Sequence, residues 1–158
     1  MSQRIPFTPD GFKKSKERLK YLKEVRRPEI INAIETAREH GDLKENAEYH
    51  AAKEQQGFCE GEVQRLEAML SRAEVIDPQT LSGERVLFSA TVVVYDPDKD
   101  EEYKYQIVGA EDGDPEAGRI SYQSPIARAL VGKELGDEVE VKLPGGVRTL
   151  EILEVIFE

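Results

Sequence analysis

Apolar residues in the first half of the chain recur with the period of an α-helix. Between residues 8 and 41 they stand at steps near three, four and seven, and they are Phe12, Leu19, Leu22, Val25, Ile30, Ile34 and Ala37. Thr8 can cap a helix that begins at Pro9, and Gly41 supplies a stop. The pattern predicts one long amphipathic helix. Because Pro28 lacks an N–H and its ring crowds the preceding turn, it predicts a kink or local opening near residues 24–28.

A second helical segment follows from about residue 43 to residue 73. Its apolar residues step by 4, 3, 4 and 3, the spacing of a heptad seam, and they are Cys59, Val63, Leu66, Leu70 and Ala73. Closer to the bend the seam positions Ala52 and Gln55 are small or polar, which predicts a hairpin held mainly at its base. The two segments together predict an antiparallel coiled-coil hairpin.

Beyond residue 83 the apolar period changes to two. Four segments alternate, or run as β-branched and aromatic residues, and they cover 85–96, 101–110, 136–143 and 148–158. Ser124 as cap, Pro125 as first residue and Gly132 as stop predict one short helix. The predicted fold class is therefore α+β. Residues 1–76 form the hairpin, residues 77–83 a linker, and residues 84–158 a small antiparallel sheet domain with one helix.

The charge is distributed unevenly over these parts. Residues 1–76 carry 14 acidic and 14 basic side chains, whereas residues 77–158 carry 18 and 8, a net of −10. This acidic surplus disfavours a protein that coats DNA by neutralising phosphates. A single cysteine excludes an internal disulfide, and no apolar run approaches the ~20 residues of a membrane span or the core of a signal peptide. We therefore expect a cytoplasmic protein with no membrane partner.

Three carboxylates, Asp42, Glu45 and Glu48, lie in the eleven residues from His40 to His50 at the bend. One interpretation is structural: Asp42 and Glu45 have the spacing of a capping box, placed where the helix dipole favours negative charge. The other is chemical, because Mg²⁺ is often held by one or two carboxylates together with phosphate oxygens. Two exposed acids make a weak site alone, but they could complete a two-metal site in another enzyme that cleaves phosphodiesters. The pattern leaves both interpretations open.

The chain resembles the bacterial transcript cleavage factors of the Gre family over nearly its whole length. The resemblance lies in residues 25–61, with "GDLKENAEY" at the bend, in "SPIARALVGK" at 124–133, and in the later "LPGG". It implies a coiled-coil hairpin that enters the secondary channel of bacterial RNA polymerase, and a C-terminal domain of FKBP-like fold near the channel entrance. In that family the acidic tip helps position a catalytic Mg²⁺ and a water, so that the polymerase hydrolyses the 3′ end of a backtracked nascent RNA.

The resemblance assigns Asp42 and Glu45, by motif, as both catalytic residues and metal ligands, with Glu48 and Tyr49 as further candidates. The Mg²⁺ would be shared with the polymerase active site and not bound tightly by the isolated protein. The protein would then not be an enzyme by itself. Two rival functions stay open: a regulator that occupies the same channel without promoting cleavage, and a coiled-coil holdase chaperone.

Basic residues concentrate between residues 13 and 27, where eight Lys and Arg face only Glu17 and Glu24, a net of +6. Such a segment is either a solvated helix face or a patch that attracts RNA phosphates. The resemblance favours contact with the nascent RNA, and the candidates are Lys13, Lys16, Lys20, Lys23, Arg26 and Arg27.

Other candidate sites are weaker. The short helix offers Ser124, Pro125 and Arg128 as contacts to the polymerase, although a packing role is equally open. His40 and His50 lack the spacing of a zinc site, and Cys59 is expected to be a small buried hydrophobic residue. A prolyl isomerase site in the sheet domain would rest on fold analogy alone.

Overall fold

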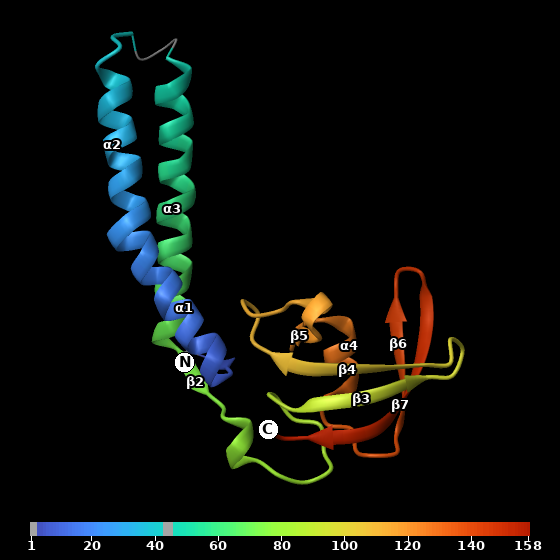
Figure 1. Ribbon diagram of the computed structural model, residues 1–158. Coiled ribbons are helices and arrows are strands. Elements are labelled where there is room, and N and C mark those ends of the chain that lie inside the picture. Colours follow the sequence, from blue (N-terminus) through green and yellow to red (C-terminus); the bar gives the residue numbers. More distant parts are fainter. Residues whose placement is uncertain (1–2, 43–45) are drawn as a thin grey trace. The chain divides into compact units, whose positions relative to one another are not determined.

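The protein combines a helical hairpin with a sheet domain, which confirms the predicted α+β class (Figure 1). The computed structural model describes residues 3–42 and 46–158. Contacts divide the chain into a helical unit, which contains residues 13–72, and a sheet unit of residues 4–12 and 73–158. In the described part of the chain, no helix is both long and apolar enough to span a bilayer.

The first arm of the hairpin begins as predicted. Helix α1 (Pro9–Tyr21) follows Thr8, whose hydroxyl oxygen accepts a hydrogen bond from the Gly11 N–H at 3.0 Å. Because this hydroxyl satisfies one of the N–H groups that the first turn leaves without a partner, it stabilises the helix start. The arm continues through a π-helical turn, η1 (Leu22–Arg26), into α2 (Arg27–Arg38).

The π-helical turn is the predicted local opening before Pro28. The Arg27 N–H donates to the Leu22 carbonyl, five residues back, and Pro28 then stands in the first turn of α2, where its missing N–H costs little. The wider turn rotates the side chains within it, so Val25 is 43% exposed and its predicted place in the buried stripe is wrong. Leu22 and Ile30, about one π turn and one α turn apart, continue the buried face.

The second arm is helix α3 (Ala47–Ser71), and it packs on the first along a narrow apolar seam. The buried residues of this seam are Leu22, Ile30, Ile34, Cys59, Val63 and Leu66. Cys59 is 5% exposed, which confirms its expected role as a small buried residue. The predicted extension of the seam to Ala73 is wrong, because α3 ends at Ser71 and Ala73 begins strand β2 (Ala73–Val75). Toward the bend, Tyr49 and Ala52 also pack on the seam.

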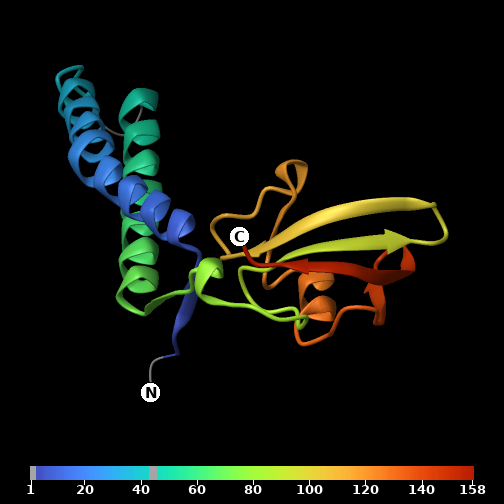
Figure 2. The same cartoon turned by 60° about the horizontal axis from the view of Figure 1, so that its bottom comes forward.

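The sheet unit is built on five strands in the order β5-β4-β3-β7-β6. Their bounds are β3 Thr91–Asp96, β4 Glu101–Val108, β5 Arg119–Ser121, β6 Glu138–Leu143 and β7 Gly146–Ile156. Strands β4, β3 and β7 lie side by side in both views (Figures 1 and 2). The predicted antiparallel pairing is correct for β3, β4, β6 and β7, but β5 pairs with β4 in parallel. A strand of three residues is too short to show a period of two.

The core of the sheet unit lies between this sheet and the short helix α4 (Pro125–Leu130). Val92 and Val94 alternate with half-buried neighbours along β3, and Ala127 and Leu130 of α4 are fully buried. The Ser124 hydroxyl accepts a hydrogen bond from the Ala127 N–H at 3.3 Å, which confirms the predicted cap. Two 3-10 turns, η2 (Pro78–Thr80) and η3 (Pro115–Ala117), lie in the connections.

A short parallel pair joins residues far apart in the sequence. Strand β1 (Ile5–Phe7) pairs with β2, and Phe7 is buried with its ring edge-on to Phe12. This pairing groups residues 4–12 with the sheet unit. The proposed division into residues 1–76, 77–83 and 84–158 stays a prediction.

Candidate functional site

The bend of the hairpin begins where α2 unwinds. After Arg38 the N–H of His40 donates to the Ala37 carbonyl at 3.1 Å, and the N–H of Gly41 donates to the Arg38 carbonyl at 3.2 Å. Gly41 has φ +102°, a backbone conformation that a side chain would strain. The predicted stop at Gly41 is therefore confirmed. Asp42 follows directly and is exposed to solvent.

Asn46 starts the second arm. Its backbone is extended, with φ −86° and ψ 98°, and its side-chain oxygen accepts a hydrogen bond from the Tyr49 N–H at 3.0 Å. The predicted cap at Asp42 is wrong, because α3 begins four residues later and Asn46 occupies the cap position. The sequence carried a signal for this, since Asn is among the strongest cap residues, but the spacing of Asp42 and Glu45 matched a capping box equally well.

Asn46 also contacts the first arm. Its side-chain N–H donates to the Ala37 carbonyl at 2.6 Å, so one amide group binds the end of α2 and the start of α3 together. Sequence reasoning missed this second bond, because a contact between two helix ends depends on how the arms meet. The expectation that the hairpin is held mainly at its base is incomplete, because the bond from Asn46 to Ala37 also joins the two arms at the bend.

An open depression of about 430 Å³ lies at the bend, lined by His40, Asp42, Asn46, Ala47 and Glu48. His40 Nε2 lies 3.7 Å from Glu48 Oε2. Because the two side chains are 62% and 75% exposed, this pair contributes little to stability. Glu45, the other predicted ligand, lies outside the described residues. The depression thus presents the Asp42 and Glu48 carboxylates to solvent.

Asp42 and Glu48 offer carboxylate oxygens at the bend, the kind of ligand that hard cations prefer. Among the residues that the structure describes, no group of three or more His, Cys, Asp or Glu could hold a metal ion. His50 lies edge-on to the Tyr49 ring, with 5.6 Å between the ring centroids. Oxygen ligands as few as these fit Mg²⁺ only where phosphate oxygens, water or further carboxylates complete its shell.

The basic segment forms a stripe along one flank of the hairpin. Its members step by 3, 4, 3 and 4, and they are Lys13, Lys16, Lys20, Lys23 and Arg27. At the end nearer the bend, Lys23 lies 2.9 Å from Glu67, and Arg27 makes two contacts with Glu60, at 2.7 and 3.0 Å. The hydrogen bond to Glu60 raises the pKa of Arg27.

Farther from the bend the same stripe is more open. Lys13, Lys16 and Lys20 are exposed, and Lys13 and Lys20 form no ion pair with any residue in the described ranges. Arg26, the sixth candidate, contacts Gln55 at 3.2 Å and Glu29 at 3.5 Å. The structure therefore separates the predicted RNA contacts into a paired group near the bend and a more open group.

The opposite flank carries a two-pronged ion pair. Arg18 Nε and Nη2 each donate to a Glu62 carboxylate oxygen at 3.0 Å. This hydrogen bonding raises the pKa of Arg18 and lowers the pKa of Glu62. With Lys23–Glu67 and Arg27–Glu60 on the other side, ion pairs connect the two arms along both edges of the seam.

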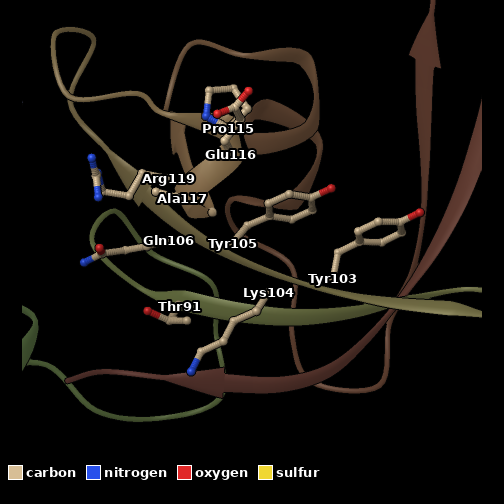
Figure 3. A pocket seen from close by; sticks show the side chains of 10 residues that line it. Thr91, Tyr103, Lys104, Tyr105, Gln106, Pro115, Glu116, Ala117 and Arg119 are labelled. Atoms are coloured by element: carbon tan, nitrogen blue, oxygen red, sulfur yellow. The ribbon is translucent and has the colours of Figure 1, made fainter.

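The sheet unit has its own hollow, an open depression of about 570 Å³ between β4 and η3. Figure 3 shows the Tyr103 and Tyr105 rings on one side of β4 and the Lys104 side chain on the other. The two rings are nearly parallel, with centroids 6.0 Å apart. Charged side chains of Lys104, Glu116 and Arg119 border the hollow, unlike the apolar pocket that a prolyl isomerase needs.

The predicted polymerase contacts lie on α4 of the sheet unit. The Ser124 side chain is committed to the helix cap, whereas Pro125 and Arg128 are exposed. A role for these residues in partner binding stays a prediction.

Sequence models of known protein families match both units of the chain. A sequence model described as transcription elongation factor, N-terminal, matches residues 5–75, and one described as transcription elongation factor, GreA/GreB, C-term, matches residues 81–157. The hairpin and the sheet domain thus both match domains of transcription elongation factors. The chain belongs to the GreA/GreB family.

Similar proteins carry the same description. Transcription elongation factor GreA of Phenylobacterium zucineum is 56% identical over 153 residues, covering 97% of this chain and 98% of the relative. The protein of that name from Rhodospirillum rubrum is 56% identical over 155 residues, covering 98% and 99%. Among solved structures, GreA factor homolog 1 (Gfh1) of Thermus thermophilus matches over 98% of this chain and 99% of that one, with 25% identity and a TM-score of 0.45. The family assignment rests on the sequence matches.

Proposed function

We propose that this protein acts in the bacterial cytoplasm, where it binds in the secondary channel of RNA polymerase and stimulates hydrolytic cleavage of the 3′ end of backtracked nascent RNA. Arrested elongation complexes would thereby resume synthesis. The observation that carries the proposal is the exposed Asp42 at the bend, which does not occupy the cap position of α3. Because Asn46 caps α3, that cap does not account for an acid at position 42.

Asp42 and Glu45 are the proposed ligands of a Mg²⁺ ion shared with the polymerase. When bound, this ion would stabilise the attacking and leaving oxygens of phosphodiester hydrolysis. Asp42 presents its carboxylate oxygens at the bend, and such oxygens can accept hydrogen bonds from a water molecule and so orient it. The polymerase would supply the remaining groups, so the factor would not be an enzyme by itself.

The open part of the basic stripe is the proposed contact for the nascent RNA. Lys13, Lys16 and Lys20 are exposed, whereas Lys23 and Arg27 are paired with Glu67 and Glu60. Exposed ammonium groups bind RNA phosphates with release of counterions. Replacing these three lysines with Ala should reduce crosslinking to the RNA 3′ end and flatten its salt dependence. Replacing Lys23 and Arg27 should have a smaller effect on crosslinking.

The sheet unit is proposed to contribute affinity for the polymerase through α4. Pro125 and Arg128 are exposed on this helix, while its buried face holds Ala127 and Leu130 in the core. Arg128→Ala should weaken binding to the polymerase and leave the maximal cleavage rate unchanged at saturating factor.

Transcript cleavage by stalled, backtracked elongation complexes tests the proposed function. Asp42→Asn and Glu45→Gln remove the negative charge but keep the shape of each side chain, and each should lower the cleavage rate at least tenfold. Glu54→Gln, an exposed acid of α3 away from the bend, is the matched control and should cleave like the parent. Parental cleavage by both bend variants would overturn the proposed role of the acids. A parent protein that slows synthesis without shortening the RNA would instead support the channel-occupying regulator.

A further inference from the structure

One side chain at the bend forms two hydrogen bonds that belong to different helices. The Asn46 oxygen accepts from the Tyr49 N–H at 3.0 Å, and the Asn46 N–H donates to the Ala37 carbonyl at 2.6 Å. The first bond is an ordinary helix cap. The second bond crosses from the start of α3 to the end of α2.

We propose that Asn46 is a positioning residue for transcript cleavage, because its bond to Ala37 fixes both ends of the acidic bend and thereby the place of Asp42. The inference rests on the proposed function. Nothing in the capping role requires the second bond, since a cap needs only an acceptor oxygen.

The chemistry of the amide explains why Asn suits this position. An amide side chain offers an acceptor and donors at once, whereas a carboxylate only accepts when ionised. A Ser hydroxyl is shorter, so it can cap α3 but cannot also span to Ala37. Asn46 is therefore the kind of residue that can complete both bonds, and variants can separate them.

The environment of the bond favours its persistence. Ala37 is 2% exposed, and its bond to Asn46 is partly buried. The same carbonyl accepts the His40 N–H at 3.1 Å, so one of the carbonyls at the end of α2 has two donors. A hydrogen bond shielded from water is stronger than one at an exposed site.

The geometry also limits how far Asp42 can move. The bond from Asn46 to Ala37 joins two points of the backbone that lie on either side of Asp42 in the sequence, and such a closure restricts the chain. Asp42 lines the same depression as Asn46. Displacement of a catalytic group by about 1 Å can cost 10²-fold in rate. A bond that holds the bend in place can therefore affect the cleavage rate strongly.

Three variants of Asn46 separate positioning from capping. Asn46→Ser and Asn46→Asp keep an acceptor for the Tyr49 N–H and lose the donor to Ala37, whereas Asn46→Ala loses both bonds. Asn32→Ser, at an exposed position on α2, is the matched control for the Ser substitution. Each protein is assayed at full length for thermal unfolding, for affinity to the polymerase, and for cleavage rate at saturating factor.

We expect Asn46→Ser to keep its polymerase affinity within twofold, to lower the unfolding temperature less than Asn46→Ala does, and to lose about tenfold in maximal cleavage rate. Asn46→Asp should show a similar loss. Asn46→Ala should show the same loss in rate and also a lower unfolding temperature, because the cap is gone. A selective loss of maximal rate without a loss of affinity is not expected of a residue that only stabilises the helix.

Parental cleavage by Asn46→Ser would overturn the inference and leave Asn46 as a helix cap. Asp42→Asn in the same assay separates the two possible failures. If Asp42→Asn abolishes cleavage while Asn46→Ser does not, only the positioning role is wrong. If Asp42→Asn cleaves like the parent, the proposed role of Asp42 fails, and the positioning role fails with it. If the parent itself does not stimulate cleavage, the proposed function fails.

Discussion

The two units of the protein bury their apolar residues in different ways. The helical unit closes a single narrow seam between two arms, with ion pairs along both edges. The sheet unit instead surrounds a cluster of fully buried residues with five strands and α4, and it places one carboxylate, Asp96, inside. A narrow seam leaves most side chains of the hairpin on its surface. Charged side chains on the flanks and at the bend of the hairpin are therefore available for contacts with other molecules. The sheet unit is stabilised by its own buried core.

The largest expected effect on stability comes from the core of the sheet unit. Leu150→Ala removes a side chain with no exposed surface, and it should lower the free energy of unfolding by about 3–5 kcal/mol. Leu66→Ala in the hairpin seam, where solvent borders both sides and the arms can close on the gap, should cost about 2–3 kcal/mol. Urea unfolding followed by tyrosine fluorescence and by helical circular dichroism compares the two units. Equal losses, or a larger loss for Leu66→Ala, would contradict the contrast between seam and core.

The second effect concerns the carboxylate inside the sheet unit. Asp96 is 1% exposed, and it accepts hydrogen bonds from the Asp98 and Lys99 N–H groups and from Arg148 Nε at 3.3 Å. Arg148→Ala would leave this charge without its cation, and the free energy of unfolding should fall by about 3 kcal/mol.

The exposed ion pair of the same unit is the matched control for Arg148. Arg85 and Glu134 lie 2.8 Å apart with side chains 62% and 55% exposed, so Arg85→Ala should cost less than about 1 kcal/mol. Denaturant unfolding of both variants checks the difference. A cost for Arg148→Ala as small as that for Arg85→Ala would show that Asp96 does not need its partner.

The smallest effect comes from the hairpin flank and depends on pH. The bond to Arg18 holds the pKa of Glu62 below its ordinary value of 4.5, so the pair contributes stability above that pH. As the pH falls through the lowered pKa of the folded protein, Glu62 takes up a proton and the contribution is lost. Glu62→Gln should therefore be less stable than the parent by under about 1 kcal/mol at pH 7. The difference should shrink as the pH falls through the lowered pKa of Glu62, and a difference that stays constant over the acid range would contradict the assignment to charge.

The helical unit was largely predictable because its signals are local. Thr8 acts on the adjacent turn through its hydroxyl, and Pro9, Pro28 and Gly41 act through their own backbones. The ends and the opening of the first arm therefore follow from residue type. Val25 could not be placed, since the register after a π-helical turn depends on where the extra residue falls. Ala73 continues the heptad spacing and yet pairs with Ile5, a partner that no local pattern reveals.

The candidate site was predictable in residue type and not in geometry. The acids of the bend and the basic stripe are visible as local charge, and Asp42 is exposed. The contacts of Asn46 with Ala37, and of the stripe with Glu60 and Glu67, join residues on different arms, so they appear only once the arms are packed. Strand β5 was missed for a different reason, because its three residues are too few to show a period of two.

The most direct test of the central claim measures cleavage against Mg²⁺ concentration. Backtracked elongation complexes are saturated with the parent or with Asp42→Asn, and the cleavage rate is recorded in a single turnover over a range of Mg²⁺. If the bend lends a ligand to the ion, Asp42→Asn should reach a lower maximal rate and require more Mg²⁺ to reach half of it. Superimposable curves for the two proteins would contradict the claim.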